Sequence, residues 1–145
     1  MTTKEAKAYL IQYRESMRRT SDIEHHLREL KAEADSLKDH EGQSIALDAA
    51  VAKYVDACND AEKELDTLAA LRIDIRSTID AVQDERLHSL LWQRYVSGFS
   101  WEQVAVSMCY TYRRVTQLHG DALKSICDIM KNEKDFLVFP IQSVV

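Results

Sequence analysis

Apolar residues recur along the first eighty positions at steps of three and four, which is the spacing of one face of a long helix. In residues 4–38 this pattern predicts one continuous helix, although Ser21 and Glu24 could also form a capping box and start a second helix there. The regular steps from Ile23 onward are typical of a coiled-coil seam. The predicted inward positions are Ala6, Leu10, Tyr13, Met17, Ile23, Leu27, Leu30, Ala34 and Leu37.

A second pattern of the same kind follows a polar stretch at 39–44, where Gly42 is the expected residue just after the helix end. Two long helices joined by a short loop predict an antiparallel hairpin over 1–82. Because a lone hairpin hides little of such seams from water, we expect it to form a homodimer or to fold back on the C-terminal part of the chain. The second set of inward positions is Val51, Val55, Cys58, Ala61, Leu65, Leu68, Leu71, Ile75, Ile79 and Val82.

The pattern shortens after residue 83 and predicts three further helices. Asp84 is placed to cap the first, Ser100 with Gln103 forms a capping box for the second, and Thr111 is placed to cap the third, which should run over 112–130. The chain is therefore predicted to be all-α, with the hairpin arm over 1–82 followed by a helix-turn-helix module over 84–131. The predicted inward positions of the module are Leu87, Leu90, Leu91, Val104, Ala105, Met108, Val115, Leu118, Ala122, Leu123, Ile126 and Ile129.

Residues 132–145 form a separate apolar tail rich in aromatic and β-branched residues, and Pro140 prevents a helix from running through it. Such a segment would aggregate if it were left in water, so we expect it to dock on a helix or on another subunit.

Composition narrows the class of protein. With 3 Gly and 1 Pro in 145 residues, the chain lacks the turn residues that an all-β sandwich or barrel needs. No apolar run is long enough to span a bilayer, and the first residues carry no apolar segment of a secretory signal. We therefore expect a soluble protein of the cytoplasm.

Candidate catalytic and metal-binding patterns are scarce. Cys58, Cys109 and Cys127 are far apart and odd in number, which argues against a disulfide framework or a zinc site. The chain has no glycine-rich phosphate loop and no nucleophile or metalloprotease motif. We expect no enzyme activity, no cofactor and no metal.

Charge is distributed unevenly along the chain, whose net charge is −5. Residues 1–80 hold 12 basic and 17 acidic side chains, whereas residues 86–124 hold five basic and two acidic ones. An acidic arm joined to a mildly basic module suggests two separate roles.

The strongest functional signal lies at the start of the last predicted helix. Because Val115 should pack inward, Tyr112, Arg113, Arg114 and Gln117 are left to face outward there. Arginine and glutamine can bind base edges or phosphates, and a helix N-terminus favours phosphate. The alternative is a three-helix packing unit in which the two arginines have no role.

The stretch from Arg94 to Val115, RYVSGFSWEQVAVSMCYTYRRV, resembles the region-four helix-turn-helix of bacterial sigma factors without a gap. Cys109 stands where that family usually has glycine, which leads us to expect a slightly different turn. The wider arrangement over about 1–130 is similar to small phage and prophage regulators of Gram-positive bacteria, of the ArpU and RinA type.

The resemblance implies a transcription regulator that binds double-stranded DNA. It places Thr111, Tyr112, Arg113, Arg114 and Gln117 in the major groove, and Ser100 and Trp101 near the phosphate backbone. The net charge of −5 favours an alternative, a protein-interaction module that contacts RNA polymerase or a host factor without reading DNA. A coiled-coil adaptor or an enzyme is a more distant alternative.

Overall fold

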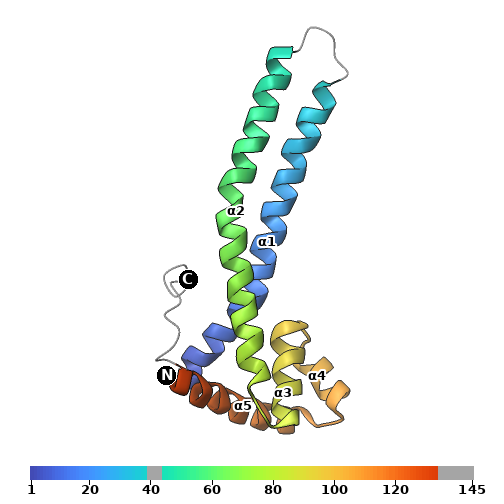
Figure 1. Cartoon of the computed structure of the whole chain (residues 1–145). Helices are drawn as coiled ribbons and strands as arrows, with labels where there is room; N and C mark the ends of the chain where they lie inside the picture. Colours follow the sequence, from blue (N-terminus) through green and yellow to red (C-terminus); the bar gives the residue numbers. More distant parts are fainter. Residues whose placement is uncertain (39–43, 134–145) are drawn as a thin grey trace. The chain divides into compact units, whose positions relative to one another are not determined.

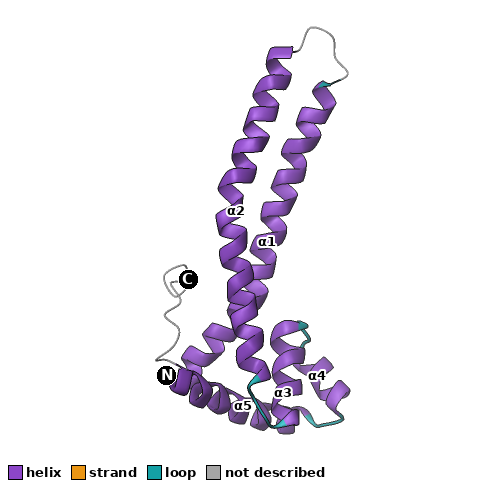
Figure 2. Cartoon of the chain, viewed as in Figure 1, coloured by secondary structure: helices purple, strands orange, loops and turns teal. Residues whose placement is uncertain are grey.

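A computed structural model describes residues 1–38 and 44–133, and within these ranges the chain is helical and contains no strand (Figures 1 and 2). This confirms the prediction of an all-α chain. None of the described helices is long and apolar enough to cross a membrane. The elements in chain order are α1 (Thr3–Leu37), α2 (Ser44–Asp80), α3 (Glu85–Leu91), the π-helical turn η1 (Trp92–Val96), α4 (Trp101–Met108) and α5 (Tyr112–Glu133).

The chain divides into two compact units, and the long helices contribute to both. One unit comprises residues 16–69, and the other comprises residues 1–15 together with residues 70–133. This division differs from the predicted arm over 1–82. The physical reason is that Leu10 and Tyr13 of α1 and Ile75 and Ile79 of α2 belong to the same buried core as the C-terminal helices.

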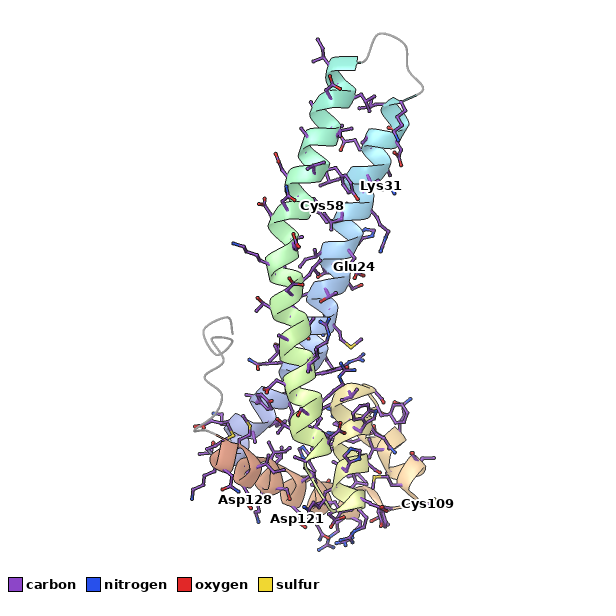
Figure 3. All side chains as sticks on the ribbon, in the orientation of Figure 1. Glu24, Lys31, Cys58, Cys109, Asp121 and Asp128 are labelled. Atoms are coloured by element: carbon purple, nitrogen blue, oxygen red, sulfur yellow. The ribbon has the colours of Figure 1, made fainter. Side chains whose placement is uncertain are left out.

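In the unit of residues 16–69, α1 and α2 lie side by side, and side chains from both extend into the space between them (Figure 3). α1 is unbroken through Ser21, as the predicted continuous helix requires. A bidentate ion pair links Arg19 to Glu64, with Nε donating to Oε1 at 2.6 Å and Nη2 to Oε2 at 3.2 Å. The buried apolar side chains of this unit are Ile23, Leu30, Ala34 and Ala50.

Part of the predicted seam in this unit was placed one residue away from the buried positions. Ser16 is buried at 3% exposure, whereas Met17 is 43% exposed, because the step after Tyr13 is three residues rather than four. On α2, Ala50 is buried, while Val51 and Val55 are 40% and 47% exposed. Both predicted valine positions therefore flank the seam instead of filling it.

The other unit has the larger core. In it α3 and α4 pack against α5, and α4 also packs against η1. Near the start of α1, the Tyr9 hydroxyl donates to the Asp74 carboxylate and lies 3.1 Å from the Thr78 hydroxyl, so two elements distant in sequence are joined by hydrogen bonds. The fully buried large side chains here are Leu10, Ile75, Ile79, Leu90, Leu91, Val104, Val115, Leu118 and Ile126.

The predicted start of α3 is confirmed by its cap. Asp84 has extended backbone, and its carboxylate accepts from the Arg86 backbone N–H at 2.9 Å. The helix then widens, because the Ser97 N–H donates to the Trp92 carbonyl five residues earlier. This π-helical turn was not predicted. The expected helix end at Gly42 and the expected docking of residues 135–145 lie outside the described residues.

Candidate nucleic-acid interface

The short helix α4 begins with the predicted capping box. The Gln103 backbone N–H donates to the Ser100 hydroxyl at 3.2 Å, and the Ser100 backbone N–H donates to Oε1 of Gln103 at 2.8 Å. Two backbone donors at the helix start are thereby satisfied. The reciprocal bonds fix the direction in which α4 leaves the turn at Gly98, and they hold Trp101 in the first turn of the helix.

The turn between α4 and α5 depends on Cys109. Its backbone is left-handed, with φ 60 and ψ 37, and the Tyr110 N–H donates to the Ala105 carbonyl at 3.0 Å. This is the conformation that glycine adopts most easily at a helix C-terminus. The expectation of a different turn geometry at Cys109 is therefore wrong, because cysteine adopts the glycine-type conformation itself.

Thr111 caps α5 as predicted, because its hydroxyl accepts from the Arg114 backbone N–H at 3.1 Å. The opposite face of the helix is fixed in the core, where Val115 and Leu118 are each 1% exposed. The residues between them point to solvent, as the helical period predicts. The exposed predicted site residues on α5 and its cap are Thr111, Tyr112, Arg113, Arg114 and Gln117.

The electrostatics of this helix start are unusual. The first turn of α5 holds no acidic residue and instead carries Arg113 and Arg114. Positive charge at a helix N-terminus is unfavourable, since the backbone N–H groups there already carry partial positive charge. Among the described residues neither arginine forms an ion pair with a carboxylate. An anion bound at the start of α5 would pair with the two arginines and would offset the positive charge at the helix N-terminus.

Trp101 is placed differently from the other predicted site residues. Its half-buried ring lies 4.5 Å from the Arg94 guanidinium carbon and meets the His119 ring edge-on, with 4.5 Å between centroids. The indole thus packs against α5 and η1. Ser100 is engaged in the capping box, so the two residues expected near phosphate stand at the start of α4, whereas the other five stand at the start of α5.

Sequence reasoning missed the cluster around this tryptophan. The Tyr95 hydroxyl oxygen lies 2.6 Å from Nε2 of His119, and the two rings are stacked. Burial raises the pKa of Tyr95 to about 12. Burial, with the positive charges of Lys7 and Arg94, lowers the pKa of His119 to about 4. Arg94 and Tyr95 fall inside the sigma-like stretch, but nothing in the sequence pairs them with His119.

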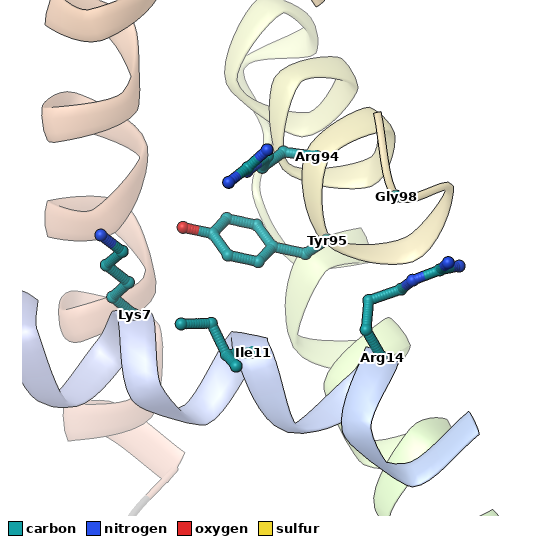
Figure 4. A pocket seen from close by; sticks show the side chains of 6 residues that line it. All are labelled: Lys7, Ile11, Arg14, Arg94, Tyr95 and Gly98. Atoms are coloured by element: carbon teal, nitrogen blue, oxygen red, sulfur yellow. The ribbon is translucent and has the colours of Figure 1, made fainter. Parts of the chain in front are cut away.

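A half-open cavity of about 210 Å³ adjoins this cluster (Figure 4). Arg14 stands at one end, where its Nη1 donates to the Val96 carbonyl at 3.3 Å and its guanidinium covers Gly98. Gly98 has φ 77, a left-handed backbone that favours glycine. A Cβ there would lie 2.7 Å from Cζ of Arg14, so the end of the Arg14 side chain would have to move. The lining residues are Lys7, Ile11, Arg14, Arg94, Tyr95 and Gly98.

Comparison with protein-family models, with curated proteins and with solved structures finds no significant match to this chain. Within residues 1–38 and 44–133, no three His, Cys, Asp or Glu side chains come together in a group that could hold a metal ion. The features that bear on function are therefore the geometry of α4, of α5 and of the residues around them.

Proposed function

We propose that the chain is a sequence-specific DNA-binding transcription regulator, and that α4, the turn at Cys109 and α5 act as a helix-turn-helix. The observation that carries this proposal is the pair of exposed, carboxylate-free arginines at the N-terminus of a helix whose other face is buried. Two positive charges at a helix N-terminus are unfavourable in the free protein, and a polyanion that binds there would stabilise them.

The chemistry of the exposed face suits a DNA duplex. A guanidinium can bind guanine O6 and N7 together or bind a phosphate, and the Gln117 amide can pair with adenine. Arg113 and Arg114 are adjacent, and Gln117 lies one turn further along the same exposed side. An α-helix with its first turn presented in this way fits the width of the major groove.

The resemblance of residues 94–115 to sigma region four supports the same proposal. The similarity of the wider arrangement over about 1–130 to small phage and prophage regulators supports a phage-type regulator, with double-stranded DNA as the proposed partner and RNA polymerase as a further candidate. The capped α4, the glycine-type turn and the capped α5 are the local features that such a motif requires.

The test is a variant that removes both charges. The intact chain is first used to select and footprint genomic DNA fragments, and the Arg113→Ala/Arg114→Ala variant is then titrated against the best fragment. We expect affinity to fall by at least tenfold at constant salt, with the circular dichroism unchanged. The matched control is Lys124→Ala/Lys131→Ala, which removes two exposed charges further along α5 and should change affinity much less.

A second candidate function rests on apolar exposure in the same segment. Val106 on α4 is 80% exposed and Tyr112 on α5 is 56% exposed, so both could add apolar area to a contact with a partner protein. A protein surface of RNA polymerase or of a host factor would cover them. Unchanged DNA affinity in the double arginine variant, with loss of RNA polymerase binding in Val106→Asp, would favour this function.

We also propose that the unit of residues 16–69 forms a homodimer. Much of its seam is only half-buried, and Met17, Ile45, Val51 and Val55 are exposed. Ile45 is 85% exposed near the start of α2. A second copy of the same helices would cover these side chains in a four-helix arrangement.

A further inference from the structure

The cavity beside η1 is lined by three cationic side chains and by no carboxylate. Lys7 and Arg14 come from α1 and Arg94 from η1. The ion pairs of this unit involve Asp84 with Arg86 and Asp80 with His88, and within the described part of the chain none includes a cation of the cavity. None of the three cations is therefore paired directly with a carboxylate that the structure describes.

Arg94 is held in a fixed position at this cavity. Its Nη1 donates to the Phe99 carbonyl at 3.0 Å, and its guanidinium plane is placed over the Trp101 ring. These contacts use one side of the guanidinium and leave further N–H groups available. A guanidinium oriented in advance loses little conformational freedom when it binds an oxyanion.

Lys7 supplies a second donor from another element. Figure 4 shows the Lys7 amine, the Arg94 guanidinium and the Tyr95 hydroxyl toward the same end of the cavity, with Arg14 toward the Gly98 end. Burial lowers the pKa of His119, and the charges of Lys7 and Arg94 lower it further, so the imidazole adds no competing positive charge near neutral pH. The Lys7 ammonium and the Arg94 guanidinium thus both lie near His119, at the same end of the cavity.

The cavity volume limits the ligand. At about 210 Å³ the space lies below the roughly 300–1,000 Å³ of pockets that hold drug-sized molecules. It suits one small anion or one anionic group of a larger molecule that extends through the open side. Ammonium and guanidinium donors together are the groups that proteins use for phosphate.

We propose that this cavity binds a single phosphate group, held by the Lys7 ammonium and the Arg94 guanidinium. The inference concerns a site separate from the exposed start of α5, and it does not depend on the proposed DNA-reading role of Arg113 and Arg114. The phosphate group is either that of a small free ligand or one of a nucleic-acid backbone, and the experiment below separates these two sources.

The test uses the full chain titrated with inorganic phosphate, with chloride adjusted to keep ionic strength constant. For a dissociation constant of about 1 mM, 10 mM phosphate should raise the melting temperature by about 3–5 °C. Phosphate should also raise the pKa of His119 in an NMR titration, because a bound anion offsets the charges of Lys7 and Arg94. If Lys7 had only a structural role, phosphate would leave the pKa of His119 unchanged.

Three variants of α1 make the test specific. Lys7→Glu should abolish both effects, Lys7→Arg should retain them, and Lys4→Glu should also retain them, because Lys4 is exposed on the same helix and does not line the cavity. Lys7 is itself exposed, so these variants are expected to fold, and circular dichroism checks this. Equal losses in Lys7→Glu and Lys4→Glu would overturn the inference.

A parallel titration with a short DNA duplex identifies the source. A Lys7-dependent response to inorganic phosphate identifies a free ligand. If the duplex raises the pKa of His119 in a Lys7-dependent way and inorganic phosphate does not, the ligand is a backbone phosphate. If neither ligand gives a response that depends on Lys7, the site does not exist. The Arg113→Ala/Arg114→Ala variant should keep its response to inorganic phosphate, so failure of the DNA-binding proposal would be seen separately.

Discussion

The Tyr95 hydroxyl oxygen lies 2.6 Å from Nε2 of His119, and this hydrogen bond joins η1 to α5. With the pKa of His119 lowered to about 4 and that of Tyr95 raised to about 12, both groups are uncharged near pH 7. Protonation of His119 would place a positive charge beside those of Lys7 and Arg94.

Stability should fall on acidification because of this histidine. The unfolded chain binds a proton at His119 near its ordinary value of 6.5, whereas the folded chain binds it near 4. The stabilising contribution is therefore complete above about pH 6.5 and is lost as pH falls toward 4. Because solvent reaches part of the ring, we expect a loss of about 1–2 kcal/mol from this group.

Urea unfolding at several pH values from 7.5 to 4.5 measures this effect. In His119→Gln the unfolding free energy should depend less on pH, while the carboxylates and the other histidines contribute equally to both proteins. His25→Gln is the control, since that ring is exposed and faces Glu29 at 2.9 Å. The same pH profile in His119→Gln as in the unaltered chain would contradict the assignment.

Cys109→Gly should stabilise the chain. The left-handed backbone at this exposed position costs an L-residue about 1–2 kcal/mol, and glycine removes that cost while adding about 0.5–1 kcal/mol of backbone entropy. We expect a net gain of about 0.5–1 kcal/mol in urea unfolding. The control Ser107→Gly, inside α4 and exposed, should lose about 0.5 kcal/mol, because glycine favours a helix less than serine does. A loss of stability in Cys109→Gly would refute this prediction.

Single substitutions of Arg113 and Arg114 should have different effects on DNA binding. Loss of the one that reads a base should cost about 1–3 kcal/mol on the preferred site and relax the preference at one base pair. Loss of the one that meets phosphate should weaken binding to all sequences alike and reduce the salt slope by about one. Titrations of Arg113→Ala and Arg114→Ala at several salt concentrations, on specific and scrambled duplexes, distinguish these outcomes. Identical profiles for both variants would contradict a division of roles.

Self-association of the unit of residues 16–69 is tested by changing its exposed valines. The full chain should be a dimer in light scattering at tens of micromolar, and Val51→Glu/Val55→Glu should shift it toward monomer. The control Lys53→Glu/Asn59→Glu places two glutamates at other exposed positions of the same helix and should remain dimeric. A monomeric unaltered chain would exclude the dimer.

Local signals in the sequence were sufficient for the helix starts. Asp84, Ser100 and Thr111 each accept from a backbone N–H two or three residues further on, so the relevant contacts lie within one turn. The inward positions of the last helix, including Val115 and Leu118, followed from the helical period because α5 has one clearly apolar face.

Contacts between distant segments could not be predicted in the same way. Ser16 is buried in place of Met17, and this choice depends on the partner helix rather than on local propensity. The contacts of Arg94 with Trp101 and of Tyr95 with His119 join η1 to α4 and α5. Of the predicted site, the exposed face of α5 was predictable, whereas the packing of Trp101 against that helix was not.

The hydrogen bond from the Ser97 N–H to the Trp92 carbonyl has a consequence for changes in chain length. The five-residue step holds one residue more than an α-helical turn, so deleting Gln93 would leave a backbone able to continue as an ordinary α-helix. Because the wide turn already accommodates the extra residue, the residues before Trp92 and after Ser97 would keep nearly the same orientation relative to each other. Arg94 and Tyr95 lie within the turn, so their contacts with Trp101 and His119 would be the ones to change. The extra residue thus sets the direction of the side chains inside η1 and leaves the course of the chain on either side of it unchanged.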